Sequence, residues 1–461
     1  MQVSQRRSLL IVVDILLVNV ALLLALWLGA QRSAWPFSLQ FAAMNFYWFL
    51  LPTAGYIILA TVNDCYDLKV ASDFTAIAWA LVRVTIEILF AYLIIYFLFP
   101  PASLPRHIIG FFSLILPVTL LTWRWVYIGI FSHPGLRRRA IIVGAGKAGR
   151  TIARAVGETL SSYYELVGFA DDDPAKYGQV FEGIPVLAST TDLSNLCQRL
   201  NVSELVVAIS KDMSAEGFQS VLTCHELGLK VTPMTLLYEQ LLGRVPVEHV
   251  GDNWSLVLPL TSVESSTVTM IVKRLLDVLV SIVGLALFCL LLPFVALAIR
   301  LDSHGPIFYR QVRVGRGGKT FRLLKLRSMV ADAENDGVAR WADQNDSRIT
   351  RVGRFLRRAR LDEMPQFYNV LVGEMSLIGP RPERPEFVAE LARQIPFYRA
   401  RLAVRPGLTG WAQTRYPYGS STEDSLVKLQ YDLYYIKHLS LYLDLLILLR
   451  TVGVVLSLKG R

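Results

Sequence analysis

The first 131 residues contain four long apolar stretches, which constrain the fold more than any other feature of the sequence. Each comes close to or exceeds the ~20 residues that a helix needs to cross ~30 Å of hydrocarbon. Four such stretches in succession favour membrane-spanning helices over the buried core helices of a soluble domain. They cover residues 9–30, 45–63, 79–99 and 108–131.

Basic residues flank this region at both ends. Arg6 and Arg7 precede the first stretch, and the basic run 137–139 follows the fourth. An even number of crossings puts both basic ends on one side, which the positive-inside rule assigns to the cytoplasm. Because the first stretch lacks a small-residue cleavage site, we interpret it as a retained anchor rather than a signal peptide. We therefore expect a four-helix transmembrane domain at 1–134, embedded in a lipid bilayer.

The composition indicates that soluble regions accompany this membrane part. Of 461 residues, 53% are hydrophobic and only 18% are charged, and the formal net charge is +10. A chain of this length is expected to form two or three domains. A basic balance favours anionic partners such as phosphates. The four cysteines form no C-x-x-C pair, which speaks against a disulfide framework or a zinc site.

Residues 135–262 have the pattern of a Rossmann-like α/β domain. An apolar strand is followed by Gly144, Gly146 and Gly149 in the spacing G-x-G-x-x-G, then by a helix and a second strand that ends in Asp171. In dinucleotide-binding folds, backbone N–H groups at such a helix start receive a pyrophosphate. Folds of this kind also serve as scaffolds. Cofactor binding at these glycines and an empty or regulatory domain are therefore equally open.

A fifth apolar run, at 278–299, contains Pro293 and precedes a strongly basic segment. Export of that segment would oppose the positive-inside rule. Proline removes a helical N–H and clashes with the preceding turn. We therefore predict a re-entrant helix over about 274–300, broken at Pro293, that returns to the cytoplasmic face. A plain fifth crossing is the alternative.

The region 305–415 carries the residue types needed for chemistry. Alternating apolar and basic positions within 305–329, around a glycine-rich turn at Gly315, Gly317 and Gly318, predict a hairpin. Further on, Asp362 and Glu363 follow several arginines. On a helix, Arg354, Arg357 and Arg358 share a face that position 361 or 362 continues.

Carboxylates beside guanidinium groups stay ionised at neutral pH and can act as nucleophiles. Adjacent carboxylates also supply the hard oxygen ligands that Mg²⁺ prefers. An isolated acidic pair of this kind would more often be a surface ion-pair cluster. The surroundings favour an anion site instead, because prolines stiffen the stretch that carries Arg381 and Arg384.

These residues resemble the polyprenyl-phosphate hexose-1-phosphate transferases, the large monotopic phosphoglycosyl transferases of bacterial exopolysaccharide and O-antigen assembly. The resemblance is dense over 270–461 and looser over the remainder. It rests on the order and spacing of KRLLDVLVSIVG, GPIFYRQVRVGRGGKTFRLLKLRSM, VGRFLRRARLDEMPQFYNVLVGEMSLIGPRP and RPGLTGWAQ. The implied fold is a multi-domain membrane protein: a four-helix transmembrane bundle, a Rossmann-like α/β domain, and an α/β catalytic domain at 268–461 with a re-entrant membrane helix.

The resemblance implies a covalent mechanism on the cytosolic membrane face. Asp362 would attack the sugar-bearing phosphorus of a UDP-sugar and release UMP, and undecaprenyl phosphate would then accept the sugar phosphate. Glu363 would help hold Mg²⁺ or orient the nucleophile, with Asp362 and Glu363 as the metal ligands. Arg357 would grip phosphate and Arg381 would help bind the nucleotide diphosphate. The resemblance favours glucose slightly over galactose and is compatible with a homodimer.

Three alternatives compete with this reading. A membrane-bound nucleotide-sugar dehydratase or epimerase would need a Tyr-x-x-x-Lys pair, but Val167 and Gly168 stand four residues after Tyr163 and Tyr164. A non-catalytic, nucleotide-sensing scaffold would leave the acidic pair and its arginines without a role. A nucleic-acid binder has only the net charge in its favour, and we expect no nucleic-acid partner.

Overall fold

The computed structural model describes residues 3–32, 47–98, 106–131, 133–209, 213–249, 267–330, 333, 346–416, 419 and 421–456. They form two compact units that divide between Thr232 and Pro233. The first unit holds a helical bundle and an α/β sheet, and the second holds the acidic pair. The end of the predicted Rossmann-like domain, at 250–262, lies outside the described residues.

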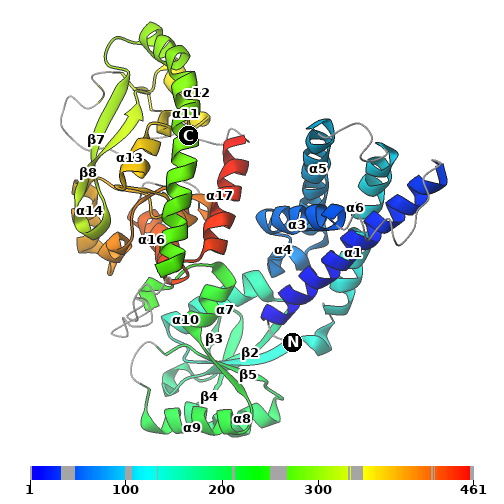
Figure 1. The fold of residues 1–461 in the computed structure, drawn as a ribbon. Helices are drawn as coiled ribbons and strands as arrows, with labels where there is room; N and C mark the ends of the chain where they lie inside the picture. Colours follow the sequence, from blue (N-terminus) through cyan, green and yellow to red (C-terminus); the bar gives the residue numbers. More distant parts are fainter. Residues whose placement is uncertain are drawn as a thin grey trace. The chain divides into compact units, whose positions relative to one another are not determined.

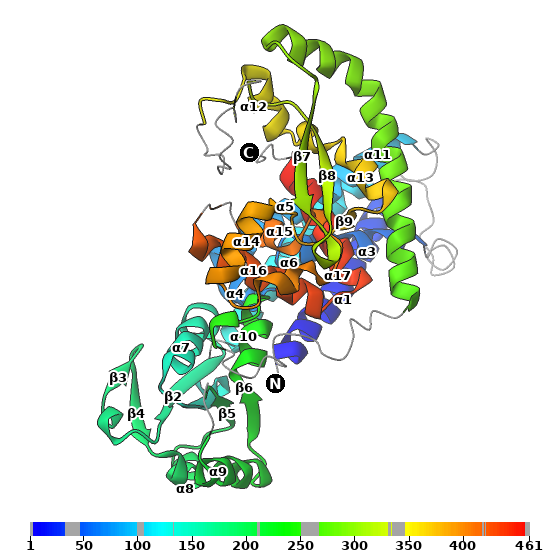
Figure 2. The ribbon, with the colours of Figure 1, turned by 90° about the vertical axis from the view of Figure 1, so that its left-hand side faces the viewer.

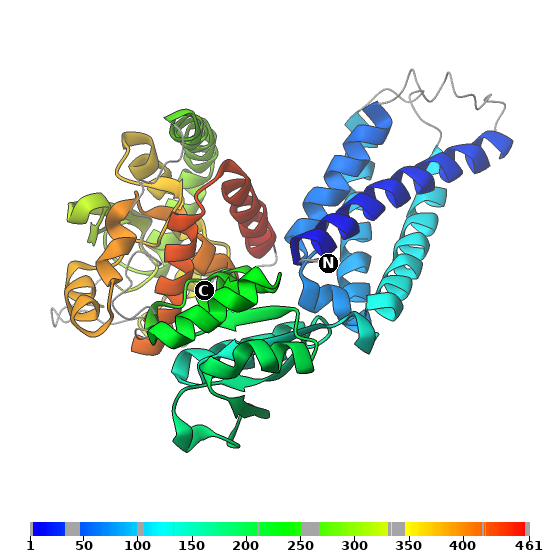
Figure 3. The same ribbon diagram turned by 90° about the horizontal axis from the view of Figure 1, so that it is seen from below.

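Helices form at all four apolar stretches of the first unit. Helix α1 packs against α3 and α6, and α5 packs against the same two helices; Figure 3 shows α1 crossing the bundle obliquely. Three of the four are long and apolar enough to cross a membrane, whereas α3 is a shorter apolar helix in the described residues. The helices are α1 (Val3–Arg32), α3 (Tyr47–Val62), α5 (Phe74–Leu98) and α6 (Arg106–Phe131).

A buried ion pair lies inside this bundle. Arg124 of α6 donates to the carboxylate of Asp14 of α1 at 2.7 Å, and the hydroxyl of Tyr56 of α3 donates to the same oxygen at 2.8 Å. A lone charge at this depth would be costly, so charged residues in membrane helices are found paired and facing the bundle interior. The pair therefore ties three helices together at one point.

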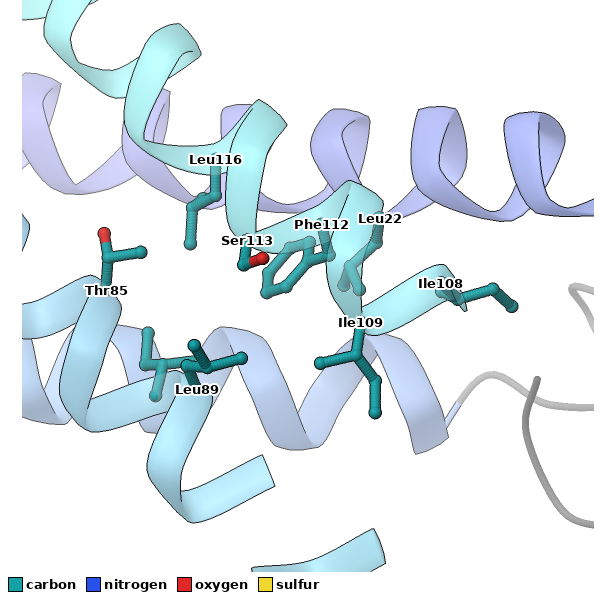
Figure 4. A pocket seen from close by; sticks show the side chains of 9 residues that line it. Leu22, Thr85, Leu89, Ile108, Ile109, Phe112, Ser113 and Leu116 are labelled. Carbon is teal, nitrogen blue, oxygen red and sulfur yellow. The ribbon is translucent and has the colours of Figure 1, made fainter. Parts of the chain in front are cut away.

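A small apolar pocket lies between α1, α5 and α6 (Figure 4). Its only polar side chains are Thr85 and Ser113, and their hydroxyls already donate to the carbonyls of Leu81 and Gly110 in their own helices. A cavity without convergent polar groups does not hold ordered water.

The α/β part of the first unit has the order β3-β4-β2-β1-β5-β6, with β1 parallel to both β2 and β5. Figure 1 shows α7 on one side of the sheet and α8 and α9 on the other. This arrangement confirms the predicted Rossmann-like fold. The elements are β1 (Arg138–Val143), α7 (Lys147–Leu160), β2 (Tyr164–Ala170), β3 (Val180–Phe181), β4 (Ile184–Ala188), α8 (Leu193–Arg199), β5 (Glu204–Val207), α9 (Ala215–Glu226) and β6 (Lys230–Pro233).

The second unit is a small mixed domain on one long helix (Figure 2). Strands β7 and β8 form an antiparallel hairpin with Val314 paired to Thr320, as the glycine-rich turn predicts, and the short strands β9 and β10 are parallel. Its elements are α10 (Met234–Leu242), α11 (Thr267–Asp302), β7 (Phe308–Val314), β8 (Thr320–Leu326), α12 (Arg351–Arg358), α13 (Gln366–Val372), β9 (Ser376–Ile378), α14 (Pro385–Gln394), β10 (Gly407–Thr409), α15 (Trp411–Arg415), α16 (Thr422–Lys437) and α17 (Leu441–Leu456).

Helix α10 follows the sheet in sequence but belongs to the second unit. Its buried Glu239 forms an ion pair with Lys437, at the end of α16, at 2.8 Å. Residues 234–242 fall within the range 135–262 that we expected for the Rossmann-like domain, and the exact domain bounds stay a prediction.

Helix α11 is one continuous element of 36 residues with Pro293 inside it. At ~1.5 Å per residue it is longer than ~30 Å of hydrocarbon. Figure 2 shows its last part bending away from the direction of its first part. The predicted break is thus a bend in a continuous helix, and the return of the chain to the same membrane face stays a prediction.

The first turns of α11 are fixed to the core of the second unit. The carboxylate of Asp277 accepts the backbone N–H of Leu377 at 2.9 Å and the hydroxyl of Ser376 at 3.1 Å. Arg274 donates to the carbonyls of Val370 and Leu371, both at 2.8 Å. These bonds join the first turns of α11 to β9 and to the end of α13, which begins just after the acidic pair.

Candidate active site

The acidic pair lies in a short turn between α12 and α13. Helix α12 ends at Arg358, and Arg360 takes a left-handed conformation with φ +54°. A non-glycine residue in that region costs roughly 1–3 kcal/mol and persists only where its surroundings fix it. The turn places Asp362 and Glu363 in a separate 3₁₀ segment, Leu361–Glu363. The predicted continuous helical face from Arg354 to position 362 is therefore wrong, because the helix stops first.

Packing of α12 on the hairpin side of the unit sets the position of this turn. Thr350 caps the helix by accepting the N–H of Gly353 at 3.0 Å. A Cβ on Gly353 would come within 2.0 Å of the carbonyl oxygen of Ser328. Only glycine allows the first turn of α12 to approach the end of β8 this closely. The acidic pair is held beside β8 for the same reason.

Glu363 is surrounded by three cations. Arg381 donates to its Oε1 at 2.7 Å, the ammonium of Lys325 lies 3.5 Å from the same oxygen, and Arg360 donates to Oε2 at 3.3 Å. The side chain is buried, and burial alone would raise its pKa. The charges of Arg381, Lys325 and Arg360 outweigh that effect and hold the pKa of Glu363 well below its usual range. Glu363 is thus an ionised anchor for the cations of the site.

Asp362 has the opposite environment. It is 6% exposed, against 8% for Glu363, yet it forms no hydrogen bond or ion pair with any residue that the structure describes. Burial, and next the negative charge of Glu363, raise its pKa to about 6. Lys325, Arg357 and Arg381 act in the other direction and keep the value below neutrality. Asp362 is therefore a carboxylate that ionises near pH 6 and is not tied up by its neighbours, as an oxygen nucleophile requires.

The backbone of the loop that carries Arg381 is fixed by a buried arginine. Arg401 donates to the backbone carbonyl of Arg381 at 2.9 Å and to the carboxylate of Asp432 at 2.8 Å. Arg401 and Asp432 are both buried. A fixed backbone lowers the entropy cost of presenting the Arg381 fork. This supports the predicted preorganisation of the proline-rich stretch.

Of the four arginines predicted to bind phosphate, two lie near the acidic pair and two do not contact it. Arg381 contacts Glu363, and Arg357 lies near enough to Asp362 to lower its pKa while its Nε donates to Ser328 at 3.0 Å. Arg384 instead lies 3.6 Å from Glu386 and over the ring of Phe387. Arg354 is exposed on α12.

Sequence reasoning did not include Lys325 and Arg360 in the site. Lys325 is partly buried on β8, and the loss of solvent lowers its pKa; it faces Glu363 from another part of the chain. The sequence signal that could have identified Lys325 is its position between two leucines in a strand, because lysines are rarely placed among apolar residues unless they are paired. Arg360 was one of five arginines before the acidic pair, and only its left-handed turn singles it out.

The glycine-rich loop of the first unit forms as predicted, but a carboxylate of the same domain already accepts one of its backbone N–H groups. Gly144 has φ +103°, and a Cβ on Gly149 would lie 1.9 Å from the carbonyl oxygen of Gly144. Gly146 caps α7. The carboxylate of Asp171 accepts the N–H of Ala145 at 2.7 Å and pairs with the ammonium of Lys176 at 2.9 Å. One N–H that a pyrophosphate would use is therefore already bonded.

The acidic side chains of the site set which metal ion it could hold. Among the described residues, no three His, Cys, Asp or Glu side chains gather in one place. Mg²⁺ commonly takes only one or two protein carboxylates and completes its shell with substrate phosphates and water. The adjacent carboxylates of Asp362 and Glu363 fit that donor set, since Asp362 is free of any cation partner in the described structure.

Comparison with known proteins gives consistent matches over both units. Residues 268–458 match the family described as bacterial sugar transferase, and residues 61–218 match a CoA-binding domain. A UDP-N-acetylgalactosamine-undecaprenyl-phosphate N-acetylgalactosaminephosphotransferase of Aeromonas hydrophila is 41% identical over 294 residues, which is 64% of this chain and 67% of the relative.

Two further relatives are UDP-glucose:undecaprenyl-phosphate glucose-1-phosphate transferases. That of Klebsiella pneumoniae is 32% identical and covers 70% of this chain and 69% of its own length. That of Caulobacter vibrioides is 46% identical over 40% of this chain and 70% of its own length. Among solved structures, UDP-D-quinovosamine 4-dehydrogenase from Vibrio fischeri matches 24% of this chain and 87% of its own at 20% identity and a TM-score of 0.20, too low to support an argument. On the sequence relatives and the matched catalytic region, the chain belongs to the bacterial sugar transferase family.

Proposed function

We propose that this protein transfers a hexose 1-phosphate from a UDP-sugar to undecaprenyl phosphate, giving UMP and a lipid-linked diphosphosugar. The names of the relatives support the reaction class. The residue assignment rests on the different environments of the two carboxylates in the acidic pair. Glu363 takes the three cations, and Asp362 is left buried, without a cation partner and with a raised pKa.

In the first step, a carboxylate oxygen of Asp362 attacks the phosphorus that bears the sugar. The new bond is Asp362 Oδ–P, and the bond from that phosphorus to the UMP oxygen breaks, so UMP leaves with the electron pair. Charge grows on the phosphoryl oxygens during this transfer. Arg381, Lys325 and Arg357 are the cations placed to receive it.

In the second step, a phosphate oxygen of undecaprenyl phosphate attacks the same phosphorus. The Asp362 Oδ–P bond breaks, the carboxylate returns to its ionised form, and the lipid-linked diphosphosugar leaves. A pKa near 6 lets Asp362 serve both as nucleophile at neutral pH and as a moderate leaving group. The two steps together leave the enzyme unchanged.

A Mg²⁺ ion would be held by Asp362, by Glu363 and by phosphate oxygens of the donor. When bound, it would neutralise charge on the diphosphate and so favour departure of UMP. The protein groups keep their own tasks. Arg381 and Arg360 orient Glu363, and the charge of Lys325 acts on both carboxylates of the pair.

The location of the site suits a soluble donor and a lipid acceptor. The first turns of α11 are bonded to β9 and α13, while much of the apolar surface of α11 stays exposed within the unit. We infer that α11 sits in the inner leaflet as a re-entrant helix, which puts the acidic pair at the cytosolic surface. Initiation of exopolysaccharide or O-antigen assembly is the pathway step that this product would serve.

The transferred sugar is the point on which the relatives differ. The sequence resemblance favoured glucose over galactose, whereas the Aeromonas relative is named for N-acetylgalactosamine. The proposal therefore covers the phosphoryl chemistry, which needs only the diphosphate. A donor panel of UDP-glucose, UDP-galactose and UDP-N-acetylgalactosamine assigns the sugar.

The test is a UMP-release assay on the purified full chain with each donor, with and without undecaprenyl phosphate. We expect sustained release only with the lipid acceptor, and at most one UMP per protein without it. Mass spectrometry should then find a sugar-phosphate adduct on the peptide that contains Asp362. Sustained UMP release without the lipid, or an adduct on another residue, would contradict the proposal. Sugar conversion that needs NAD but no lipid would support a dehydratase or epimerase instead.

A further inference from the structure

A small polar pocket lies where the helical bundle meets the α/β sheet of the first unit. The start of α1, the short helix α4 (Leu68–Ser72), the end of α6 and the turn after α7 surround it. It is separate from the acidic pair, which belongs to the second unit. Its polar lining consists of one guanidinium and four hydroxyls, from Arg6, Ser72, Tyr127, Ser162 and Tyr163.

Arg6 is the central feature of this pocket. It is 4% exposed, and its guanidinium carbon lies 4.5 Å from the ring centre of Phe131 and 4.4 Å from that of Tyr163. Stacking between two rings uses the faces of a guanidinium and leaves its N–H edge free to donate. The guanidinium hydrogen-bonds to the hydroxyl of Tyr127, and its Nε has no hydrogen-bond partner among the described residues.

The charge of Arg6 is not balanced by a carboxylate. Among the described residues, Arg6 forms no ion pair. Arg138 does not line the pocket: its guanidinium carbon lies 6.0 Å from the ring centre of Tyr163, and it pairs with Glu204 at 2.9 Å. A buried charge without a counter-ion is costly. A buried cation surrounded by hydroxyls is therefore the composition expected of an anion-binding site.

We propose that this pocket binds a phosphate group at the membrane surface, with Arg6 as its main cation and the surrounding hydroxyls as further donors. Guanidinium groups bind phosphate oxygens through paired N–H donors. Arg6 stands at the first turn of a helix that is apolar enough to cross a membrane, and Phe131 stands at the last turn of another. That depth is where the phosphodiester of an anionic lipid lies, so the structure favours a lipid headgroup over free phosphate.

The experiment measures thermal unfolding of the full chain in nanodiscs of phosphatidylcholine alone and of phosphatidylcholine with phosphatidylglycerol. A third arm adds inorganic phosphate to the phosphatidylcholine discs. We expect phosphatidylglycerol to raise the midpoint by about 2–5 °C and inorganic phosphate to raise it less. An equal rise with inorganic phosphate would assign the site to free phosphate instead of the lipid. No rise in either arm would overturn the proposal.

Three variants locate the effect. Arg6→Gln should abolish the phosphatidylglycerol shift, and Arg7→Gln, which removes the same charge one residue away from the pocket, should keep it. Ser162→Leu fills the pocket without changing charge, so it should also abolish the shift and covers the case in which Arg6→Gln does not fold. A shift of wild-type size in Ser162→Leu, or an equal loss in Arg7→Gln, would show general attraction to anionic membranes and overturn the assigned pocket.

Discussion

Two segments of this protein carry an acid next to groups that bind anions, and they use it in opposite ways. In the glycine-rich loop of the first unit, Asp171 bonds to the loop N–H of Ala145 and to Lys176. In the turn of the second unit, Glu363 takes the cations and Asp362 is left without one. Asp171 stabilises the fold because it hydrogen-bonds to the loop beside it. Asp362 is available for chemistry because the nearby cations pair with Glu363 instead.

The sharpest test of this difference removes the charge of Asp362. Asp362→Asn keeps the shape of the side chain but removes the nucleophile, so UMP release should fall by at least about 10³-fold. The unfolding midpoint should change little, because no bond in the described structure is lost. The exposed Glu390→Gln on α14 serves as control. Full UMP release by an active Asp362→Asn protein would refute the nucleophile assignment.

Removal of the partner carboxylate should have a smaller but broader effect. Glu363→Gln leaves Arg381, Lys325 and Arg360 without their anion, so we expect roughly 10²-fold lower kcat/KM and about 3–5 kcal/mol lower stability. Both are measured on purified protein by UMP release and by thermal unfolding. The exposed Glu390→Gln on α14 should match wild type. Retained activity and stability in Glu363→Gln would show that Glu363 is not the anchor of the site.

The pH profile tests the electrostatic coupling within the pair. Asp362 attacks only as a carboxylate, so kcat/KM should fall about tenfold per pH unit below a pKa of about 6. The negative charge of Glu363 helps to raise that pKa. In Glu363→Gln the pKa of Asp362 should therefore fall, and the acid limb of the residual activity should move to lower pH. A limb that stays in place would mean that another group controls it.

The corresponding change in the first unit should affect stability alone. Asp171→Asn weakens the bonds to Ala145 and Lys176, at a cost of about 1–2 kcal/mol of unfolding free energy. Burial raises the pKa of Asp171, but hydrogen bonds from Lys176, Asp173 and Ala145 outweigh it and lower the pKa. This stabilisation is complete above the unfolded pKa of about 3.9 and is lost as pH falls through the folded value. A large loss of kcat in folded Asp171→Asn would break the comparison.

The smallest expected effect is that of adding a dinucleotide. Because the N–H of Ala145 is already bonded, NAD should change the unfolding midpoint by less than about 1 °C even at millimolar concentration. A ligand at 100 times its Kd would add about 2.7 kcal/mol and be plainly visible. Such a shift with NAD would show that Asp171 gives way and that the loop is a nucleotide site.

Local pattern was enough to predict several parts of this fold. Apolar length predicted the helices of the bundle, G-x-G-x-x-G predicted the turn from β1 to α7, and alternation around Gly317 predicted the hairpin. Pattern failed where a local rule was overridden. The helical spacing of the arginines suggested a continuous face, but the left-handed Arg360 ends that helix before Asp362.

Contacts between distant residues were beyond the reach of pattern. Lys325 comes to Glu363 from β8, Arg401 supports the Arg381 loop from 20 residues away, and Asp14 meets Arg124 across the bundle. Nothing in the spacing of these residues pairs them. Such pairs exist because a buried charge must find a partner, and only the packed chain determines which partner is within reach.

By itself, the sequence determined the residue types of the site: an acidic pair, its arginines, a proline-stiffened loop and an apolar helix beside them. The tertiary structure decided which of the two carboxylates pairs with the cations and which is left for catalysis. Both carboxylates are buried in the same turn, but Arg381, Lys325 and Arg360 all face Glu363. Burial without a partner raises the pKa of one acid, and burial among cations lowers that of the other. That difference depends on distances of a few ångströms, which no linear pattern contains.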